Sequence, residues 1–187
     1  MPTPLSSKAE ILDRLMVTFR TGGYDGASLA DLSAATGLGK SSLYHYFPGG
    51  KSQMATEVLA HLGASLEREI LQPLRGPGAP KTKLVTLLRT LSAFYDSGRM
   101  PCLLERLCAS VEAPTFRTPL RHAFTSLIDG IQQLCESAGI SRITAKERAL
   151  DAVIRIEGSL IVGAGLGDPA TFTRTLAHLR RSLLARD

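Results

Sequence analysis

Apolar residues recur at intervals of three and four along almost the whole chain, and this period is the feature that most limits the folds open to it. No segment shows the sustained alternation of β-branched and polar residues that marks a half-buried strand. Hydrophobic residues make up 44% of the 187, which is enough to bury a sizeable core. The sequence therefore predicts an all-α protein.

Cap and stop signals divide the pattern into about nine helices. Ser7 with Glu10, and Ser28 with Asp31, have the spacing of capping boxes, and Gly37 is a stop signal. The sequence RGPGAP breaks a long fourth helix. The expected helices are about 8–22, 29–36, 40–47, 51–74, 81–97, 101–111, 116–138, 144–166 and 169–186. We expect a three-helix N-terminal head followed by a C-terminal helical bundle.

The charges of the head give no general attraction for an anion. Lys and Arg exceed Asp and Glu by only 22 to 17, and the first sixty residues hold equal numbers of basic and acidic side chains. A nucleic-acid site in the head would therefore depend on the local arrangement of a few groups.

The chain shows no basic stretch followed by an apolar run at its start, and its longest apolar segment is too short to span a bilayer. We therefore expect a cytoplasmic protein without a membrane partner. Cys102, Cys108 and Cys135 have no metal-ligand spacing and are expected to be buried reduced thiols. No metal site and no other cofactor is predicted.

The segment GLGKSSLYHYFPGGK, residues 37–51, predicts a short helix with two different faces. On a helix, Leu43 and Phe47 share one side, where they can pack on the first two helices. The opposite side carries polar groups and no acid. A helix followed by a glycine turn and a second helix seated by its apolar back is the helix-turn-helix arrangement, here at about residues 28–47, whose second helix enters the major groove of DNA.

Several side chains of this segment have groups that can bind phosphate or base edges. The candidate DNA-binding residues are Ser28, Lys40, Ser41, Ser42, Tyr44, His45 and Lys51. Simpler roles compete with some of them: Ser28 as a helix N-cap, Tyr44 as a packing ring, His45 as a solvated side chain and Lys51 as an ordinary surface lysine.

The segment GASLADLSAATGLGKSSLYHYFPGGK resembles the head of TetR-type repressors. The shared features are Gly23-Tyr24, Ser28, Gly37, the run from Leu43 to Phe47, and Lys51. The three residues between Phe47 and Lys51, where two are usual, resemble the LmrA/YxaF-like subgroup of multidrug-type repressors. Gly39 departs from the pattern, since a serine or threonine is common there.

The resemblance implies a C-terminal domain that binds an apolar or aromatic effector. Apolar helical faces supply the candidate ligand-binding residues Leu62, Leu66, Leu88, Leu91, Tyr95, Leu104, Cys108, Phe124, Leu127, Ile128, Ile131, Ile154 and Glu157. Periodicity alone cannot distinguish a cavity wall from a filled core. Glu157 could instead form a salt bridge or lie at an exposed helix edge.

The last two helices suit close helix packing, either within the chain or between two copies. We favour a homodimer, because helix-turn-helix proteins commonly pair their half-sites. The predicted interface residues are Leu160, Ile161, Phe172, Leu176, Leu179 and Leu183. The expected division is a DNA-binding domain at residues 1–55 and a ligand-binding and dimerisation domain at 56–187.

Together these expectations predict a ligand-responsive transcriptional regulator. The resemblance implies that it is a repressor that is released from a palindromic operator. One alternative is an all-helical enzyme acting on a hydrophobic molecule. It lacks support, because the histidines are scattered and no nucleophile lies in a recognisable motif, so no catalytic residue is predicted. Another is a dimeric scaffold without DNA recognition.

Overall fold

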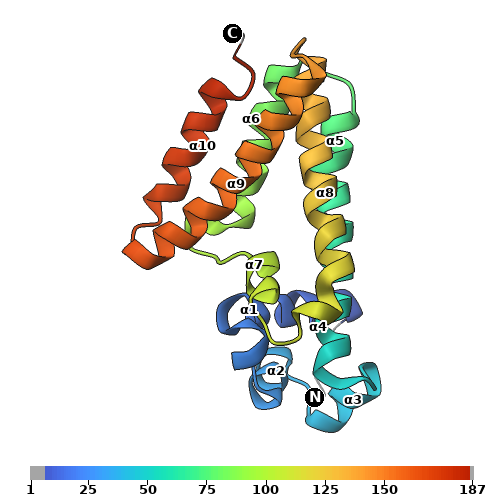
Figure 1. Cartoon of the computed structure of the whole chain (residues 1–187). Coiled ribbons are helices and arrows are strands. Elements are labelled where there is room, and N and C mark those ends of the chain that lie inside the picture. The colour runs from blue at the N-terminus through green and yellow to red at the C-terminus, as the bar shows by residue number, and fades with distance from the viewer. Residues whose placement is uncertain (1–6, 186–187) are drawn as a thin grey trace. The chain divides into compact units, whose positions relative to one another are not determined.

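The computed structural model describes residues 7–185. Its helices are α1 Lys8–Gly26, α2 Leu29–Thr36, α3 Lys40–Tyr46, α4 Gly50–Leu66, η1 Glu67–Leu71, α5 Gln72–Arg75, α6 Pro80–Phe94, η2 Asp96–Gly98, α7 Leu103–Cys108, α8 Ala113–Ser137, α9 Arg142–Leu166 and α10 Ala170–Ser182 (Figure 1). Because α4, the π-helical η1 and α5 follow one another without a break, nine separate helices and one 3-10 turn account for all regular structure in the described residues. The all-α prediction is confirmed.

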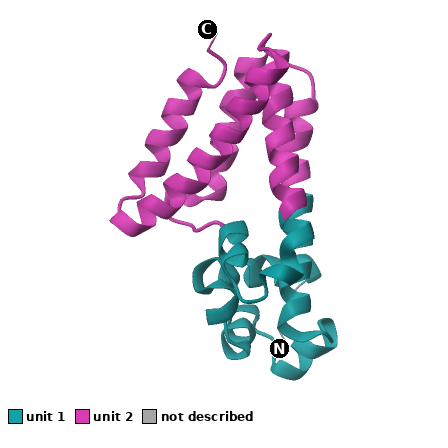
Figure 2. Cartoon of the chain, in the orientation of Figure 1, with its two compact units in different colours: residues 1–64, 103–120 teal, residues 65–102, 121–187 magenta. Residues whose placement is uncertain are grey.

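The chain forms two compact units (Figure 2). The first contains the described residues up to 64 together with 103–120, and the second contains 65–102 and the described residues from 121 onwards. The division falls within the continuous helix that begins with α4. These are units of packing, and the predicted functional boundary between residues 55 and 56 remains a prediction.

Local signals start the first two helices as expected. The Ser7 hydroxyl accepts a hydrogen bond from the Glu10 N–H at 3.3 Å, and the Glu10 carboxylate accepts one from the Ser7 N–H at 2.8 Å. Ser28 and Asp31 form the same box at the start of α2. Each box satisfies N–H groups that a helix start would otherwise leave unpaired.

The core of the first unit is formed by the apolar faces of its helices. Ile11, Leu15 and Phe19 on α1 have no exposed surface. They belong to a set of side chains buried to 1% exposure or less that also includes Leu32, Leu43, Phe47, Met54, Val58, Leu103, Leu107 and Phe116. Segment 103–120 thus supplies core residues to the same unit as the head.

The second unit contains a close approach that only glycine permits. Gly98 has a φ of 96°, and a Cβ atom there would lie 2.7 Å from the Phe172 Cβ and 2.7 Å from the Pro169 carbonyl oxygen. The absence of a side chain lets η2 pack against the start of α10. Phe172 is fully buried there, and its ring meets the Tyr95 ring edge to face at a centroid distance of 5.5 Å.

Some helix ends differ from expectation. Helix α6 ends at Phe94 and not near residue 97, because Asp96 and Ser97 have positive φ values of 44° and 54°. Helix α7 is shorter than expected, and α10 ends at Ser182. Within the described residues, no helix is both long enough and apolar enough to cross a membrane.

Candidate nucleic-acid interface

Helix α3 is held on the first unit by its apolar back. Leu43 and Phe47 are 1% and 0% exposed. The turn before α3 is fixed by Gly37, which caps α2 in the left-handed conformation at φ 71°. Arg14 of α1 donates a hydrogen bond from Nη1 to the Thr36 carbonyl oxygen at 3.1 Å, so α1 also ties down the end of α2. The two helices and their turn therefore form a helix-turn-helix.

The opposite face of α3 is exposed and polar. It carries Ser41, Ser42 and His45, with Tyr44 at its edge, and Lys40 lies in the first turn of the helix; all five are exposed. Tyr44 is 46% exposed, and the His45 and Tyr46 rings meet edge to face at a centroid distance of 6.0 Å. This face combines hydroxyl, imidazole and ammonium groups, which can bind phosphates and base edges. Whether each residue contacts DNA remains a prediction.

Lys51 lies in the first turn of α4, with its ammonium group against the end of α1. Its Nζ is 4.6 Å from the centroid of the Tyr24 ring and 3.5 Å from the Asp25 carbonyl oxygen. A cation over an aromatic face is attracted by the ring. Lys51 is thus a positioned cation, and its role toward DNA stays a prediction.

Ser28 is engaged in capping. Its Oγ accepts from the Asp31 N–H at 3.1 Å and donates to the Asp31 carboxylate at 2.6 Å. The hydrogen bonds from the Ser28 side chain and then its backbone lower the pKa of Asp31. A Ser28 hydroxyl that donated to phosphate would have to leave the Asp31 carboxylate, so the structure favours the N-cap role.

Two contacts that the sequence did not reveal join the head to segment 103–120. The Val111 N–H donates to the Asp25 carboxylate at 3.1 Å. The Tyr24 ring meets the Phe116 ring edge to face at a centroid distance of 5.3 Å. No local pattern could have indicated these pairs, because their members lie about ninety residues apart in the chain.

The predicted ligand-binding residues are divided between the two units. Leu62, Leu104 and Cys108 belong to the first unit, and the other ten belong to the second. Most of the apolar members are buried, but Ile154 is 60% exposed and Cys108 is exposed. The expectation of a buried thiol is wrong for Cys108, whereas Cys102 and Cys135 are buried. A ligand-binding role for Ile154 and Cys108 remains a prediction.

Glu157 lies in a polar cluster of the second unit. The Cys102 thiol donates to its Oε1 at 3.5 Å, and the Tyr95 hydroxyl donates to the Cys102 sulfur at 3.5 Å. Tyr95 and Glu157 of the predicted set are therefore linked through Cys102. A ligand contact by these residues remains a prediction. In the described part of the chain, no group of three or more side chains is arranged to hold a metal ion.

The predicted dimer-interface residues are mostly part of the chain's own core. Leu160, Phe172, Leu176, Leu179 and Leu183 are buried, between 0% and 7% exposed. Ile161 is 54% exposed. The stripe on α10 packs within the second unit, so its residues have little surface left for a second copy. Of the six, Ile161 keeps a surface that could serve an interface.

The comparisons with known proteins agree with a helix-turn-helix domain in this part of the chain. Residues 11–58 match the family described as "Bacterial regulatory proteins, tetR family". The chain is 25% identical over 160 residues to the HTH-type transcriptional regulator LmrA of Bacillus subtilis (strain 168). The match covers 83% of this chain and 85% of LmrA.

Solved structures show the same fold. A TetR transcriptional regulator from Legionella pneumophila superposes with a TM-score of 0.84 at 16% identity, over 96% of this chain and 99% of that one. A cysteine mutant of the TetR family transcriptional regulator CifR, complexed with 26-bp double-strand operator DNA, superposes with a TM-score of 0.73 at 27% identity over the whole of both chains.

The helix-turn-helix and its relatives define the class: this protein is a helix-turn-helix transcriptional regulator. Its N-terminal domain is that of the TetR family, and the match to LmrA agrees with the predicted subgroup. The family and these relatives are transcriptional regulators and not enzymes.

Proposed function

We propose that this regulator is a homodimeric repressor that binds a palindromic operator through α3 and leaves it when a hydrophobic small molecule binds the C-terminal bundle. The observation that carries the proposal is the exposed polar face of α3, held in place by the buried Leu43 and Phe47. That CifR is complexed with operator DNA supports the same role here. Such a role would place the protein in the cytoplasm.

The proposed dimer rests on an exposed apolar stripe of α9. Ile143, Leu150, Ile154 and Ile161 follow at intervals of seven and four residues, so they share one face of the helix. They are between 48% and 76% exposed. Exposed apolar side chains that share one helix face are typical of a surface covered by another protein. A two-fold pairing of α9 would bring two heads to two half-sites.

Segment 103–120 supports a route by which an effector could change DNA binding. Its residues pack with the head, and it continues directly into the second unit at both of its ends. A ligand that binds one arrangement of the bundle better than another shifts the population toward that arrangement. Through this segment the shift would alter the separation of the two heads, with a coupling of about 1–3 kcal/mol.

The experiment that tests the function is retardation of a DNA fragment taken from the neighbouring promoter. A fragment bound in preference to unrelated DNA of equal length, and released by an apolar or aromatic compound, is the expected result. Equal retardation of the promoter fragment and unrelated DNA would contradict the operator-binding role and favour the scaffold alternative.

A further inference from the structure

A groove with a basic rim runs between α6 and α10 in the second unit. Of the residues predicted to bind the effector, only Leu88 lines it. Its larger part has a volume of about 910 Å³ and is lined by Ala79, Pro80, Lys81, Leu84, Val85, Ser137, Ala138, Arg180, Arg181, Leu184 and Ala185. A second part of about 550 Å³ shares Val85, Arg180 and Arg181 and continues along the same two helices to Ser92 and Thr173. We call both parts the α6–α10 groove.

The floor of the groove is apolar. Leu84 and Leu184 contribute to the larger part, and Leu88 and Leu176 to the smaller. Val85 lines both parts and leaves 45% of its surface exposed, although it lies in the middle of α6. Each part taken singly has a volume within the range of about 300–1,000 Å³ that is typical of small-molecule sites.

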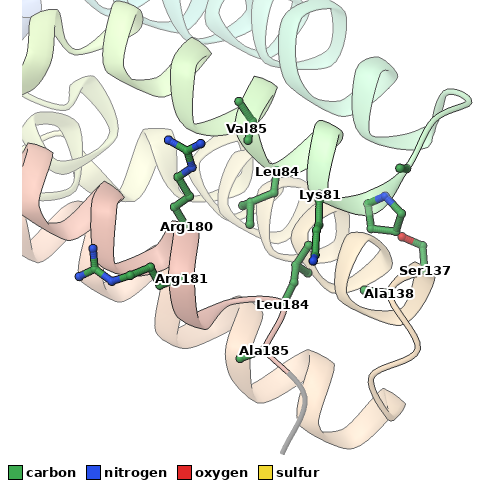
Figure 3. A pocket seen from close by; sticks show the side chains of 11 residues that line it. Lys81, Leu84, Val85, Ser137, Ala138, Arg180, Arg181, Leu184 and Ala185 are labelled. Atoms are coloured by element: carbon green, nitrogen blue, oxygen red, sulfur yellow. The ribbon is translucent and has the colours of Figure 1, made fainter.

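The rim of the groove carries cations and no described carboxylate. In Figure 3, Lys81 extends from α6 toward Leu184, and Arg180 reaches from α10 toward Val85, whereas Arg181 points away. Arg89 lines the second part. None of the described residues that line either part is Asp or Glu, and these cations form no ion pair with a described carboxylate.

An apolar floor flanked by cations that have no carboxylate partner among the described residues suits a ligand with an apolar chain and one anionic end. Lys81 and Arg180 approach from different helices, so a carboxylate could accept a hydrogen bond from either one while its chain covers Val85 and the leucines. A cationic amphiphile would be repelled by the same rim. The observations therefore favour an anion over the cationic drugs that also carry apolar rings.

We propose that the α6–α10 groove binds a free monocarboxylate with an apolar chain, of the medium-chain fatty acid class. For its biological role this inference rests on the proposed function, because it names the chemical class of a compound that the regulator would sense. Binding itself is measured without DNA, so the two proposals can fail separately.

The test is calorimetric titration of the full chain with decanoate, kept below the concentration at which it forms micelles. Decanol and decyltrimethylammonium serve as probes of equal chain length without the negative charge. Saturable binding of decanoate, and weaker binding of the other two, is the expected result. Equal binding of all three, or retention on phosphatidylglycerol vesicles without decanoate binding, would overturn the proposal.

Matched variants assign the binding to the groove. Lys81→Gln and Arg180→Gln should each weaken decanoate binding about fivefold, since each removes one partly exposed charge contact. Val85→Ser should weaken decanoate and decanol alike. Arg121→Gln is the charge control, and Val17→Ser is the apolar control, because Val17 is 46% exposed but lies on α1. All changed residues are exposed, so folding should persist and is checked by helical circular dichroism.

Two outcomes separate the proposals. If the promoter fragment is bound but the groove variants and their controls bind decanoate equally, the groove assignment is wrong and operator binding stands. If decanoate binding follows the groove variants but no DNA is preferred, the groove stands and the proposed function is wrong.

Discussion

The Lys51 ammonium is placed against the Tyr24 ring and the Asp25 carbonyl before any DNA is bound. A cation held in this way loses less side-chain entropy when it meets a phosphate than a freely rotating lysine would. The same geometry shows that one residue can have two roles, because Lys51 also joins the start of α4 to the end of α1.

Replacement of Lys51 by Ala should weaken binding to specific and unrelated DNA alike. If Lys51 neutralises one phosphate, its loss should reduce the slope of log affinity against log salt by about one per site. Fluorescence anisotropy over a range of salt concentrations measures the slope. Lys146→Ala, an exposed change on α9, is the control and should leave the slope unchanged. An unchanged slope in Lys51→Ala would remove this residue from the interface.

The cysteines differ in environment, and the difference gives a pH prediction. Burial raises the pKa of Cys135 to about 11 from the usual 9.0. The folded state therefore favours the protonated thiol, whose stabilising effect is complete below pH 9 and is lost as the pH rises toward 11. The stability difference between the wild type and Cys135→Ala, measured by urea unfolding, should shrink over this range. A difference independent of pH would contradict it.

At the scale of the element, helix ends set by local signals could be predicted from the sequence, whereas helix ends set by tertiary packing could not. Helix α2 could be predicted with its ends, because Ser28 and Gly37 act within their own neighbourhood. The end of α6 could not be predicted, since Asp96 and Ser97 have positive φ values that their residue types do not indicate, in a turn that packs on α10. Periodicity identified an apolar stripe on α10, but it does not say which surface covers the stripe.

The same reasoning applies to the two sites. The exposed face of α3 was predictable because Leu43 and Phe47 are close in sequence to the polar residues opposite them. The α6–α10 groove was not, because Lys81 and Arg180 lie about a hundred residues apart and no local pattern pairs them. Sites built on one helix can be read from its period, whereas sites shared between distant helices need the fold.

Gly98 provides a test of the packing between η2 and α10. Gly98→Ala should destabilise the protein by about 2 kcal/mol or more, since a methyl group would overlap Phe172 and Pro169 in a strained backbone. Gly139→Ala is the matched control, because Gly139 also has a positive φ, 86°, but a Cβ there would meet nothing within 4 Å. Thermal and urea unfolding measure both. An equal loss in the two variants would show that backbone strain, and not the close contact, requires glycine at position 98.

At the scale of the whole molecule, function as proposed requires two copies and a bundle that responds to a ligand. Because the stripe on α10 is buried within the chain, we propose the exposed face of α9 as the interface in its place. Association cannot be tested with Leu160→Glu or Leu176→Glu, because each would place a charge in the core and unfold the chain. Exposed positions on α9 test association without that effect.

Ile154→Glu and Ile161→Glu should shift the protein from dimer to monomer, because each places a charge in the proposed apolar interface. Sedimentation equilibrium measures the change, and operator affinity should fall in parallel. Val17→Glu, at a position exposed to a similar extent on α1, should stay dimeric. Two α9 variants that remain dimeric and bind DNA normally would contradict the α9 interface.

The most direct test of the central claim, that α3 reads the operator, is the binding of Ser41→Ala, Ser42→Ala and His45→Ala to an operator, to single-base operator mutants and to unrelated DNA. A variant that removes a base contact should lose about 1–3 kcal/mol of binding free energy for the operator and lose its preference at one base position. Its affinity for unrelated DNA should be unchanged. Ser65→Ala on α4 is the control. If all three variants keep the wild-type sequence preference, α3 does not read the operator.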